Sequence, residues 1–404
     1  MAVNRRTSRD IRSESRLTVM RALLAAGEST RNRLAEDTGL SIGTVSTVVS
    51  DLLKHGIITE TGQVGGSIGR PTTGLRPNAD RGRVVGVYVD VEEAYLAAKV
   101  YDAELGELAL AEATIDEGLD DADTVIHGIE RVLGAALERA RANRDDVLGV
   151  GILLPGGTRR PVKVPVAAPN AIWLHLDRLR DRLGLPVVVE NPLKAKATAE
   201  LWLGAGRRRT NIVTVTLGIG VGAGIVQDGV LTRGSSDSAG EWGHTLFTFD
   251  GRLCRCGRRG CVEAYLGADG IRQTLAEIAP GHPLAAEPGR RRFLEALAES
   301  PGREAADTVE RTAHYLGAAL TDLVALVNPE VITLSGWTAR FLGERMLPIV
   351  RRRVAEESPG DAAADLAIEI SSLSDPGMTG IAAVALERFM RDVGLVTTRM
   401  LPAI

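Results

Sequence analysis

The sequence predicts a two-lobed α/β protein that carries a helix-turn-helix domain at its N-terminus. Two short helical patterns meet at Gly39, and from Val84 onward the pattern changes to strands. Two successive rounds of three strands and helices follow, which is typical of duplicated α/β lobes with a cleft between them. We therefore divide the chain into residues 1–82, a first lobe of 83–195 plus 378–395, and a second lobe of 196–377.

Composition and charge narrow the class of protein. The 404 residues are 44% hydrophobic and 25% charged, which is typical of globular domains. Because no apolar run reaches the roughly 18 residues of a membrane span, and the charged N-terminus has no signal core, we expect a cytoplasmic protein without a membrane partner. Residues 1–83 carry a net charge of +5 and the remainder −9. The basic part favours a polyanionic partner, although a chance imbalance on a solvated surface would look the same.

The N-terminal segment has the order of a winged helix-turn-helix. Apolar residues at helical spacing fill 17–26, Ser29 is placed to cap a second helix that stops at Gly39, and Ser41 is placed to cap a third that covers residues 42–56. Two strand-like stretches around a glycine-rich turn then form a wing. This order predicts DNA binding; the alternative is a three-helix domain that only docks on the rest of the chain.

The third helix has one apolar face, and its other faces carry small hydroxyl side chains. It lacks Arg, Asn and Gln, so we expect modest direct readout, with threonine methyls and serine hydroxyls meeting thymines and phosphates. Arg70, in the wing sequence GRP, is the better specificity candidate because a guanidinium on a stiff turn suits a narrow A·T-rich minor groove. The predicted DNA-contacting residues are Arg31, Ser41, Thr44, Ser46, Thr47, Ser50, Lys54 and Arg70.

The two lobes are expected from strand and helix patterns in order. The first has strands at 84–91, 94–102, 107–113, 147–156 and 186–191, and helices at 123–143, 175–183 and 192–204. The second begins with two strands within 211–234 that fold back through Gln227, Asp228 and Gly229. A helix at 312–327 and a strand at 331–336 follow.

The three cysteines of the chain fall within eight residues. Cys254, Cys256 and Cys261 follow His244, and together they supply three sulfurs and one imidazole nitrogen, a tetrahedral ligand set for zinc. A closed set of four protein ligands leaves no position for water, so we expect a structural zinc ion that braces the loop. The alternative is a cluster of reduced cysteines without metal.

The segments GEWGH and CRCGRRGCVEAY resemble the signature of the ROK family, which contains bacterial sugar kinases and sugar-controlled repressors. The resemblance runs from about Leu17 to Leu386, and the wing sequence GRP is similar to the repressor branch. It implies an actin-like (ribonuclease-H-like) fold for the two-lobe body and a sugar or sugar phosphate between the lobes. The effector contacts that it implies are Asn170, Asn191, Glu241, His244 and Glu263.

The resemblance breaks at the positions of the kinase chemistry. Where the family's kinases read Asn-Asp-Ala-Asn, residues 191–194 read Asn-Pro-Leu-Lys, and proline cannot accept the proton of a sugar hydroxyl. Where the kinases read Asp-x-Gly-Gly-Thr, residues 90–94 read Asp-Val-Glu-Glu-Ala, whose carboxylates would repel ATP phosphates. These departures predict a regulator and not an enzyme.

We therefore expect a repressor of carbohydrate uptake or breakdown genes that binds operator DNA as a homodimer or homotetramer and answers to a sugar. Two alternatives stay open. Pro192 and Lys194 could have removed the sugar response, leaving a regulator with another effector or partner; equally, Lys194 and Lys196 could favour a phosphorylated or acidic sugar. An ATP-dependent sugar kinase with an added DNA-binding domain is the less favoured alternative.

Overall fold

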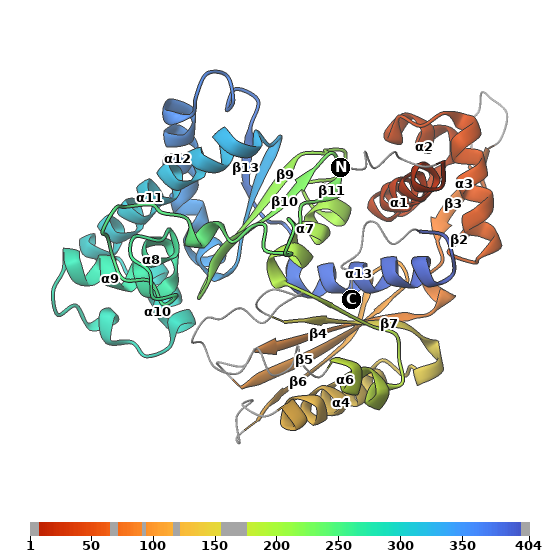
Figure 1. The fold of residues 1–404 in the computed structure, drawn as a ribbon, viewed down its shortest axis with the longest axis horizontal. Coiled ribbons are helices and arrows are strands. Elements are labelled where there is room, and N and C mark those ends of the chain that lie inside the picture. Colours follow the sequence, from red (N-terminus) through yellow and green to blue (C-terminus); the bar gives the residue numbers. More distant parts are fainter. Residues whose placement is uncertain (1–7, 65–71, 91–93, 116–121, 155–175, 397–404) are drawn as a thin grey trace. The chain divides into compact units, whose positions relative to one another are not determined.

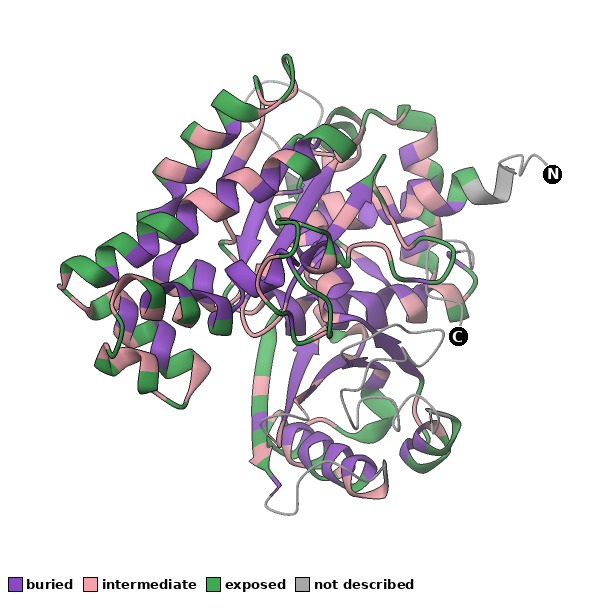
Figure 2. Ribbon diagram, turned by 60° about the vertical axis from the view of Figure 1, so that its left-hand side comes forward, coloured by how far each residue is buried: buried purple, intermediate pink, exposed green. Residues whose placement is uncertain are grey.

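The computed structural model describes residues 8–64, 72–90, 94–115, 122–154 and 176–396 (Figure 1). The chain divides into two compact units. The first unit comprises residues 1–203 and 377–404, and the second unit comprises residues 204–376. No helix within the described residues is long and apolar enough to cross a membrane. In both units most strands are buried, and the helices that cover the sheets each have one buried face and one exposed face (Figure 2).

The first unit begins with the winged domain that the sequence predicts. Its elements are α1 (Ser8–Ala26), β1 (Ser29–Thr30), α2 (Arg31–Thr38), α3 (Ile42–Lys54), β2 (Ile58–Val64) and β3 (Thr72–Pro77). The three strands form an antiparallel sheet in the order β1-β3-β2. Gly39 ends α2 in a left-handed conformation, with φ of 68°, which produces the turn before α3.

Two sequence-based boundaries in this domain were wrong. The first helix begins at Ser8 and not near residue 17, because its early face is buried through small serines, Ser13 and Ser15, that carry no hydrophobic signal. The second helix is capped by Thr30, whose hydroxyl accepts a hydrogen bond from Arg33 N at 3.3 Å, and not by Ser29. Ser29 and Thr30 both pair with β3, Ser29 with Leu75 and Thr30 with Gly74, but Thr30 is the residue directly before α2, so its hydroxyl is the one that caps the helix.

The rest of the first unit is a five-stranded sheet with helices on both faces. Its elements are β4 (Arg83–Asp90), β5 (Tyr95–Asp102), β6 (Glu107–Thr114), α4 (Ala122–Arg139), β7 (Val147–Leu153), α6 (Leu176–Leu183), β8 (Val187–Glu190), α7 (Pro192–Leu203) and α13 (Pro376–Asp392), with short turns η1 (Ala79–Arg81) and η2 (Arg144–Asp146). The strand order is β6-β5-β4-β7-β8; β4, β5 and β6 pair antiparallel, and β7 is parallel to both β4 and β8.

Helix α13 lies unusually close to its neighbours. A Cβ atom added to Gly151 of β7 would stand 2.4 Å from the Ile381 carbonyl oxygen, and one added to Gly380 would stand 1.8 Å from the Ala195 carbonyl oxygen of α7. Only glycine permits such an approach of backbone to backbone. The helix is therefore fixed against the sheet on one side and against α7 on another.

The second unit repeats the topology of the first sheet. Its elements are β9 (Ile212–Leu217), β10 (Val221–Gln227), β11 (Val230–Leu231), η3 (Trp242–His244), α8 (Glu263–Leu266), α9 (Ala268–Ile278), η4 (Pro283–Ala286), α10 (Arg290–Glu299), α11 (Arg303–Val327), β12 (Val331–Ser335), α12 (Trp337–Glu357) and β13 (Ala367–Ile370). The strand order is β11-β10-β9-β12-β13, with three antiparallel strands followed by two parallel ones, as in the first unit. The predicted duplicated lobes are confirmed.

The segment 211–234 contains three strands and not the two that were expected. The predicted turn at Asp228 and Gly229 is present, with φ of 52° and 73°, but it joins β10 to the short β11. The preceding turn, at Gly218–Gly220, joins β9 to β10. Both central residues of the second turn have positive φ, as a tight hairpin of this kind requires.

Candidate metal centre, DNA-binding surface and sugar contacts

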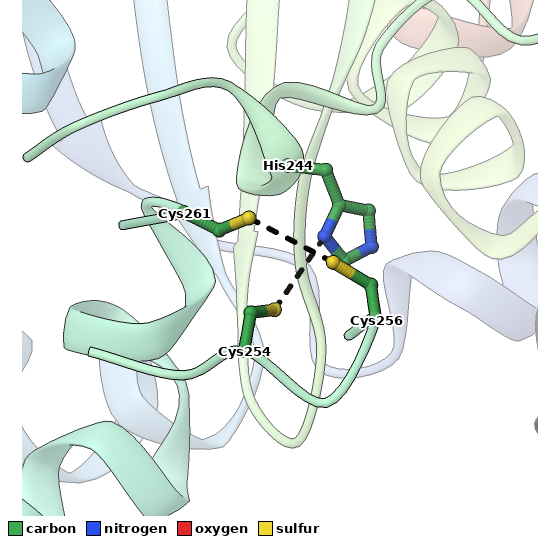
Figure 3. A group of neighbouring side chains, drawn as sticks. All are labelled: His244, Cys254, Cys256 and Cys261. Atoms are coloured by element: carbon green, nitrogen blue, oxygen red, sulfur yellow. Dashed lines mark hydrogen bonds between the residues drawn. The ribbon is translucent and has the colours of Figure 1, made fainter. Parts of the chain in front are cut away.

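The four predicted zinc ligands lie together in the second unit. His244 ends η3, and the cysteines occupy the loop between η3 and α8 (Figure 3). Two isolated bridges, Leu246 with Cys261 and Leu253 with Arg259, fold this loop back on itself. Gly260 makes the fold possible, because a Cβ atom there would stand 1.8 Å from the Thr248 carbonyl oxygen.

The spacing of the four ligand atoms fits a tetrahedral zinc ion. All of them lie within 4.8 Å of one another. The Sγ atoms of Cys256 and Cys261 are 3.7 Å apart, and Cys254 Sγ is 3.8 Å from His244 Nδ1. A tetrahedron with metal–sulfur bonds of ~2.3 Å has edges of about 3.8 Å. The chemistry and the spacing of these donors therefore suit structural zinc.

Burial opposes the ionisation of the thiols in this cluster. Burial raises the pKa of the Cys254 thiol to about 12 and also raises the pKa of Cys261. Burial opposes ionisation of Cys256 as well, but hydrogen bonds from the backbone and side chain of Arg258 outweigh it and lower the pKa of that thiol. A zinc ion would supply the charge that three neighbouring thiolates need.

Glu263, an expected effector contact, joins the cysteine loop to the sheet. Its side chain is 6% exposed. Oε2 accepts a hydrogen bond from Val221 N at 3.0 Å, and Oε1 accepts one from Arg255 Nε at 3.0 Å and one from the Cys254 thiol at 3.6 Å. The carboxylate is thus held in one orientation beside the metal cluster by groups from two segments of the chain.

Glu241 precedes η3 and His244 ends it, but only His244 is half-buried. Its Nδ1 faces Cys254, so its other ring nitrogen, Nε2, is left for a second partner. Glu241 precedes η3 and is exposed. The second unit therefore holds three of the five expected effector contacts, and two of them, His244 and Glu263, lie at the metal cluster.

Asn191 lies in the first unit, where it caps α7. Its side-chain oxygen accepts a hydrogen bond from Leu193 N at 2.8 Å, and its own backbone N–H donates to Glu190 Oε1 at 2.9 Å. Pro192 is the first residue of α7, the position at which a proline costs a helix no hydrogen bond. Lys194 is 2% exposed, so it lies inside the lobe. Asn170, the remaining expected contact, lies outside the described residues.

The expected DNA-contacting face of α3 is open to solvent. Val45, Val48, Val49 and Leu52 are buried on one side of the helix. Of the hydroxyl face, Ser41, Thr47, Ser50 and Lys54 are exposed, whereas Thr44 and Ser46 are half-buried. The Ser41 hydroxyl caps the helix by accepting from Thr44 N at 3.1 Å, as the sequence predicts.

Two arginines, Arg31 and Arg70, were also predicted to contact DNA. Arg31 forms an ion pair with Glu60 of β2 at 3.2 Å, so its guanidinium is oriented by the wing strand. Arg70 lies outside the described residues. Sequence reasoning missed Ile42, which is 50% exposed at the start of α3. The signal was available, because Ile42 is an apolar residue that falls off the buried stripe of that helix.

The arrangement defines a winged helix-turn-helix protein with an actin-like body of two repeated α/β units. The chain belongs to the ROK family: the family model matches residues 89–388, and a model for winged helix-turn-helix DNA-binding domains matches residues 12–59.

Similar proteins include both regulators and kinases. A xylose repressor from Caldicellulosiruptor bescii is 25% identical over 89% of this chain and 92% of its own. A glucokinase from Halalkalibacterium halodurans is 30% identical over 65% of this chain and 83% of its own. Among solved structures, a ROK family transcriptional regulator described as a homologue of the E. coli MLC protein has a TM-score of 0.71 at 23% identity, covering 94% of this chain and 99% of its own.

Proposed function

We propose that this chain is a transcriptional repressor that binds operator DNA through the winged domain and is controlled by a sugar or sugar phosphate that it does not phosphorylate. The observation that carries this proposal is the combination, in one chain, of an exposed hydroxyl-bearing α3 with a ROK body whose general-base position is Pro192. A DNA-binding element joined to a non-catalytic sugar-binding body has one evident use, which is to report sugar occupancy to DNA.

DNA binding is supported by the shape and charge of the winged domain. Small polar side chains on α3 let the helix enter the major groove closely, while Ile42 offers apolar contact to thymine methyl groups. Residues 1–83 carry a net charge of +5, which suits the phosphate backbone. The other DNA contacts that we propose are Arg31, Ser41, Thr44, Ser46, Thr47, Ser50, Lys54 and Arg70.

Sugar recognition is supported by oriented polar groups and by the relatives. Glu263 is held by two N–H donors, Val221 N and Arg255 Nε, and His244 keeps one ring nitrogen for a further hydrogen bond. Such fixed acceptors and donors suit a polyhydroxylated ring. The names of several relatives, xylose repressor among them, favour a sugar as effector. We propose Asn170, Asn191, Glu241, His244 and Glu263 as its contacts.

The proposal includes the loss of sugar kinase activity. Pro192 has no group that accepts a proton, and the Asn191 carboxamide oxygen already accepts a hydrogen bond from the first turn of α7. Neither residue can therefore deprotonate a sugar hydroxyl. We further propose that zinc bound by His244 and the three cysteines holds the loop that carries Glu263, and that the chain acts as a homodimer or homotetramer on paired operator sites.

The test combines operator binding with a kinase assay. Fluorescence anisotropy with DNA from upstream of the chain's own gene, in the presence and absence of xylose, glucose, N-acetylglucosamine and glucose 6-phosphate, should show site-specific binding that one of these sugars weakens. Coupled ADP release with the same sugars should stay at background. Lys54→Ala should weaken binding without changing the sugar response, whereas Glu263→Gln should shift the sugar concentration required.

Several outcomes would separate the alternatives. Absence of any site-specific DNA binding contradicts the proposed regulator. Operator binding that no sugar alters, together with no thermal stabilisation by any sugar, favours a regulator with another effector. ADP release that depends on sugar would contradict the loss of kinase chemistry.

A further inference from the structure

The recognition helix α3 is held at its C-terminal end by an arginine from α1. Arg16 donates from Nη2 and Nε to Asp51 Oδ2 at 2.5 and 3.2 Å. Its Nη1 donates to the carbonyl oxygen of Leu395 at 3.0 Å, just beyond the end of α13. The Arg16 side chain is 17% exposed. One guanidinium therefore joins the last turns of α3 to the segment that follows α13.

A second arginine, which follows α3 in the sequence, makes an equivalent connection. Arg81, in the η1 turn between the winged domain and β4, donates from Nε to the carbonyl oxygen of His55 at 3.2 Å. His55 is the residue that ends α3. The same guanidinium lies over the Phe389 ring of α13, 4.9 Å from its centroid. Arg16 and Arg81, hereafter the arginine pair, thus both connect the end of α3 to the end of α13.

The helix that receives these contacts is itself fixed. Glycines let α13 pack directly against the sheet and against α7, as described above. One continuous cluster of buried side chains includes Leu17 and Leu52 of the winged domain together with Leu386 and Leu395. Close-packed interiors transmit displacement because they contain little free volume. A hinge between the winged domain and β4 would therefore have to disrupt this cluster.

We propose that the arginine pair positions the recognition helix on α13, so that the winged domain and the first lobe move as one rigid body. The part of this inference that concerns sugar rests on the proposed function. In this arrangement a sugar changes the placement of α3 only by moving the entire first unit. The arginine pair then serves DNA recognition without touching DNA: it transmits the position of α13 to the helix that reads the operator.

The rigidity is tested by a distance measurement that needs neither operator nor sugar. Spin labels carried on non-natural amino acids would replace Glu36 of α2 and Glu138 of α4, both exposed, because cysteine labels would compete with the proposed zinc ligands. We expect one narrow distance distribution in the otherwise unaltered chain, unchanged by any effector sugar. The double variant Arg16→Ala/Arg81→Ala should broaden it. A broad distribution without the double substitution, or a peak that sugar moves, would overturn the proposal.

Matched variants separate coupling from general damage. Arg388→Ala removes an exposed ion pair with Asp392 that stays within α13, and it should leave the distribution narrow. Phe389→Leu keeps the apolar contact but removes the aromatic ring beneath Arg81, so it should broaden the distribution even if the double variant does not fold. Unaltered width in both the double variant and Phe389→Leu contradicts the proposal.

Operator binding provides a second readout. In a coupled regulator the ratio of operator affinities without and with sugar is typically about 5–150. The double variant should bind the operator more weakly and bring this ratio toward 1, whereas Lys54→Ala should lower both affinities and keep the ratio. A double variant that retains the unaltered ratio would overturn the coupling. If the unaltered chain binds no operator, the proposed function fails, and the distance measurement still decides the role of the arginine pair.

Discussion

The contact between α7 and α13 leads to a quantitative prediction at Gly380. In the variant Gly380→Ala, the new Cβ atom would stand 1.8 Å from the carbonyl oxygen and 2.5 Å from the carbonyl carbon of Ala195. Ordinary contact begins near 3.4 Å, so the two helices must separate by about 1.6 Å. Overpacking of this kind costs about 1–3 kcal/mol, and the upper end applies because backbone meets backbone.

The helix itself gains from the same substitution. Alanine is better than glycine in a helix interior by ~1 kcal/mol, so the net cost of Gly380→Ala is about 2 kcal/mol. For a unit of this size, about 2–4 °C of melting temperature correspond to each kcal/mol. We expect circular dichroism to show a melting temperature lower by about 4–8 °C.

The matched control is Gly134→Ala in α4. Nothing lies within 4 Å of a Cβ atom at Gly134, so only the helix-propensity gain of about 0.4–1 kcal/mol remains and the melting temperature should rise slightly. Opposite signs for the two glycines are the signature of close packing at Gly380. A Gly380→Ala protein as stable as the Gly134→Ala protein would refute the close approach of α7 and α13.

Three further variants test the metal cluster, the DNA surface and one titrating group. Cys256→Ser removes one ligand of four, so bound zinc, measured by atomic absorption after dialysis, should fall from about one ion per chain to below ~0.1. The control Arg259→Ala, in the same loop, should retain zinc. Equal zinc content in the two variants would argue against the site. Ile42→Ala should weaken operator binding about two- to fivefold in anisotropy titrations, with no change in melting temperature, since the side chain is half exposed; unchanged affinity would remove Ile42 from the DNA surface. Hydrogen bonds from the backbone of Asn211 and Thr210 outweigh the opposing effect of burial and lower the pKa of Glu330. The stability that this carboxylate adds is therefore present above the ordinary glutamate pKa and is lost as pH falls through its lowered value. Urea unfolding of Glu330→Gln should show a free energy of unfolding lower by less than about 1 kcal/mol at pH 7, and this difference should vanish in acid. A difference that persists in acid would contradict the assignment.

Short-range patterns carried most of what the sequence could predict. The spacing of His244 and the three cysteines predicted that these four side chains lie together, because zinc requires its ligands close to one another and the intervening loop is short. The apolar stripe of α3 likewise identified which side of that helix is buried. Alternating strands and helices predicted the duplicated units, whose sheets share one order.

Features that depend on contacts between distant parts of the chain could not be predicted from the sequence. Thr30 and Ser29 are equivalent as caps by chemistry, and the choice between them depends on where pairing with β3 ends and α2 begins, which is at Thr30. No helix was expected between the cysteine loop and residue 312, yet η4 and α10 form there, because Phe293, Leu294 and Leu297 pack into the core of the second unit. The partners of Arg16 lie 35 and 379 residues away along the chain, beyond the reach of any local pattern.

The shared core of the winged domain and the C-terminal segment sets a rule for retargeting such regulators to new operators. Leu395 and Val396 are buried in the same cluster as Leu17 and Leu52, so the core of the winged domain is built from two segments that lie far apart in the sequence. A chimera joined only at the junction before β4 would combine the winged domain of one regulator with the residues that follow α13 in another. The side chains that pack between these two segments would then not match. Exchanging the winged domain together with the residues that follow α13 would keep the native packing between them.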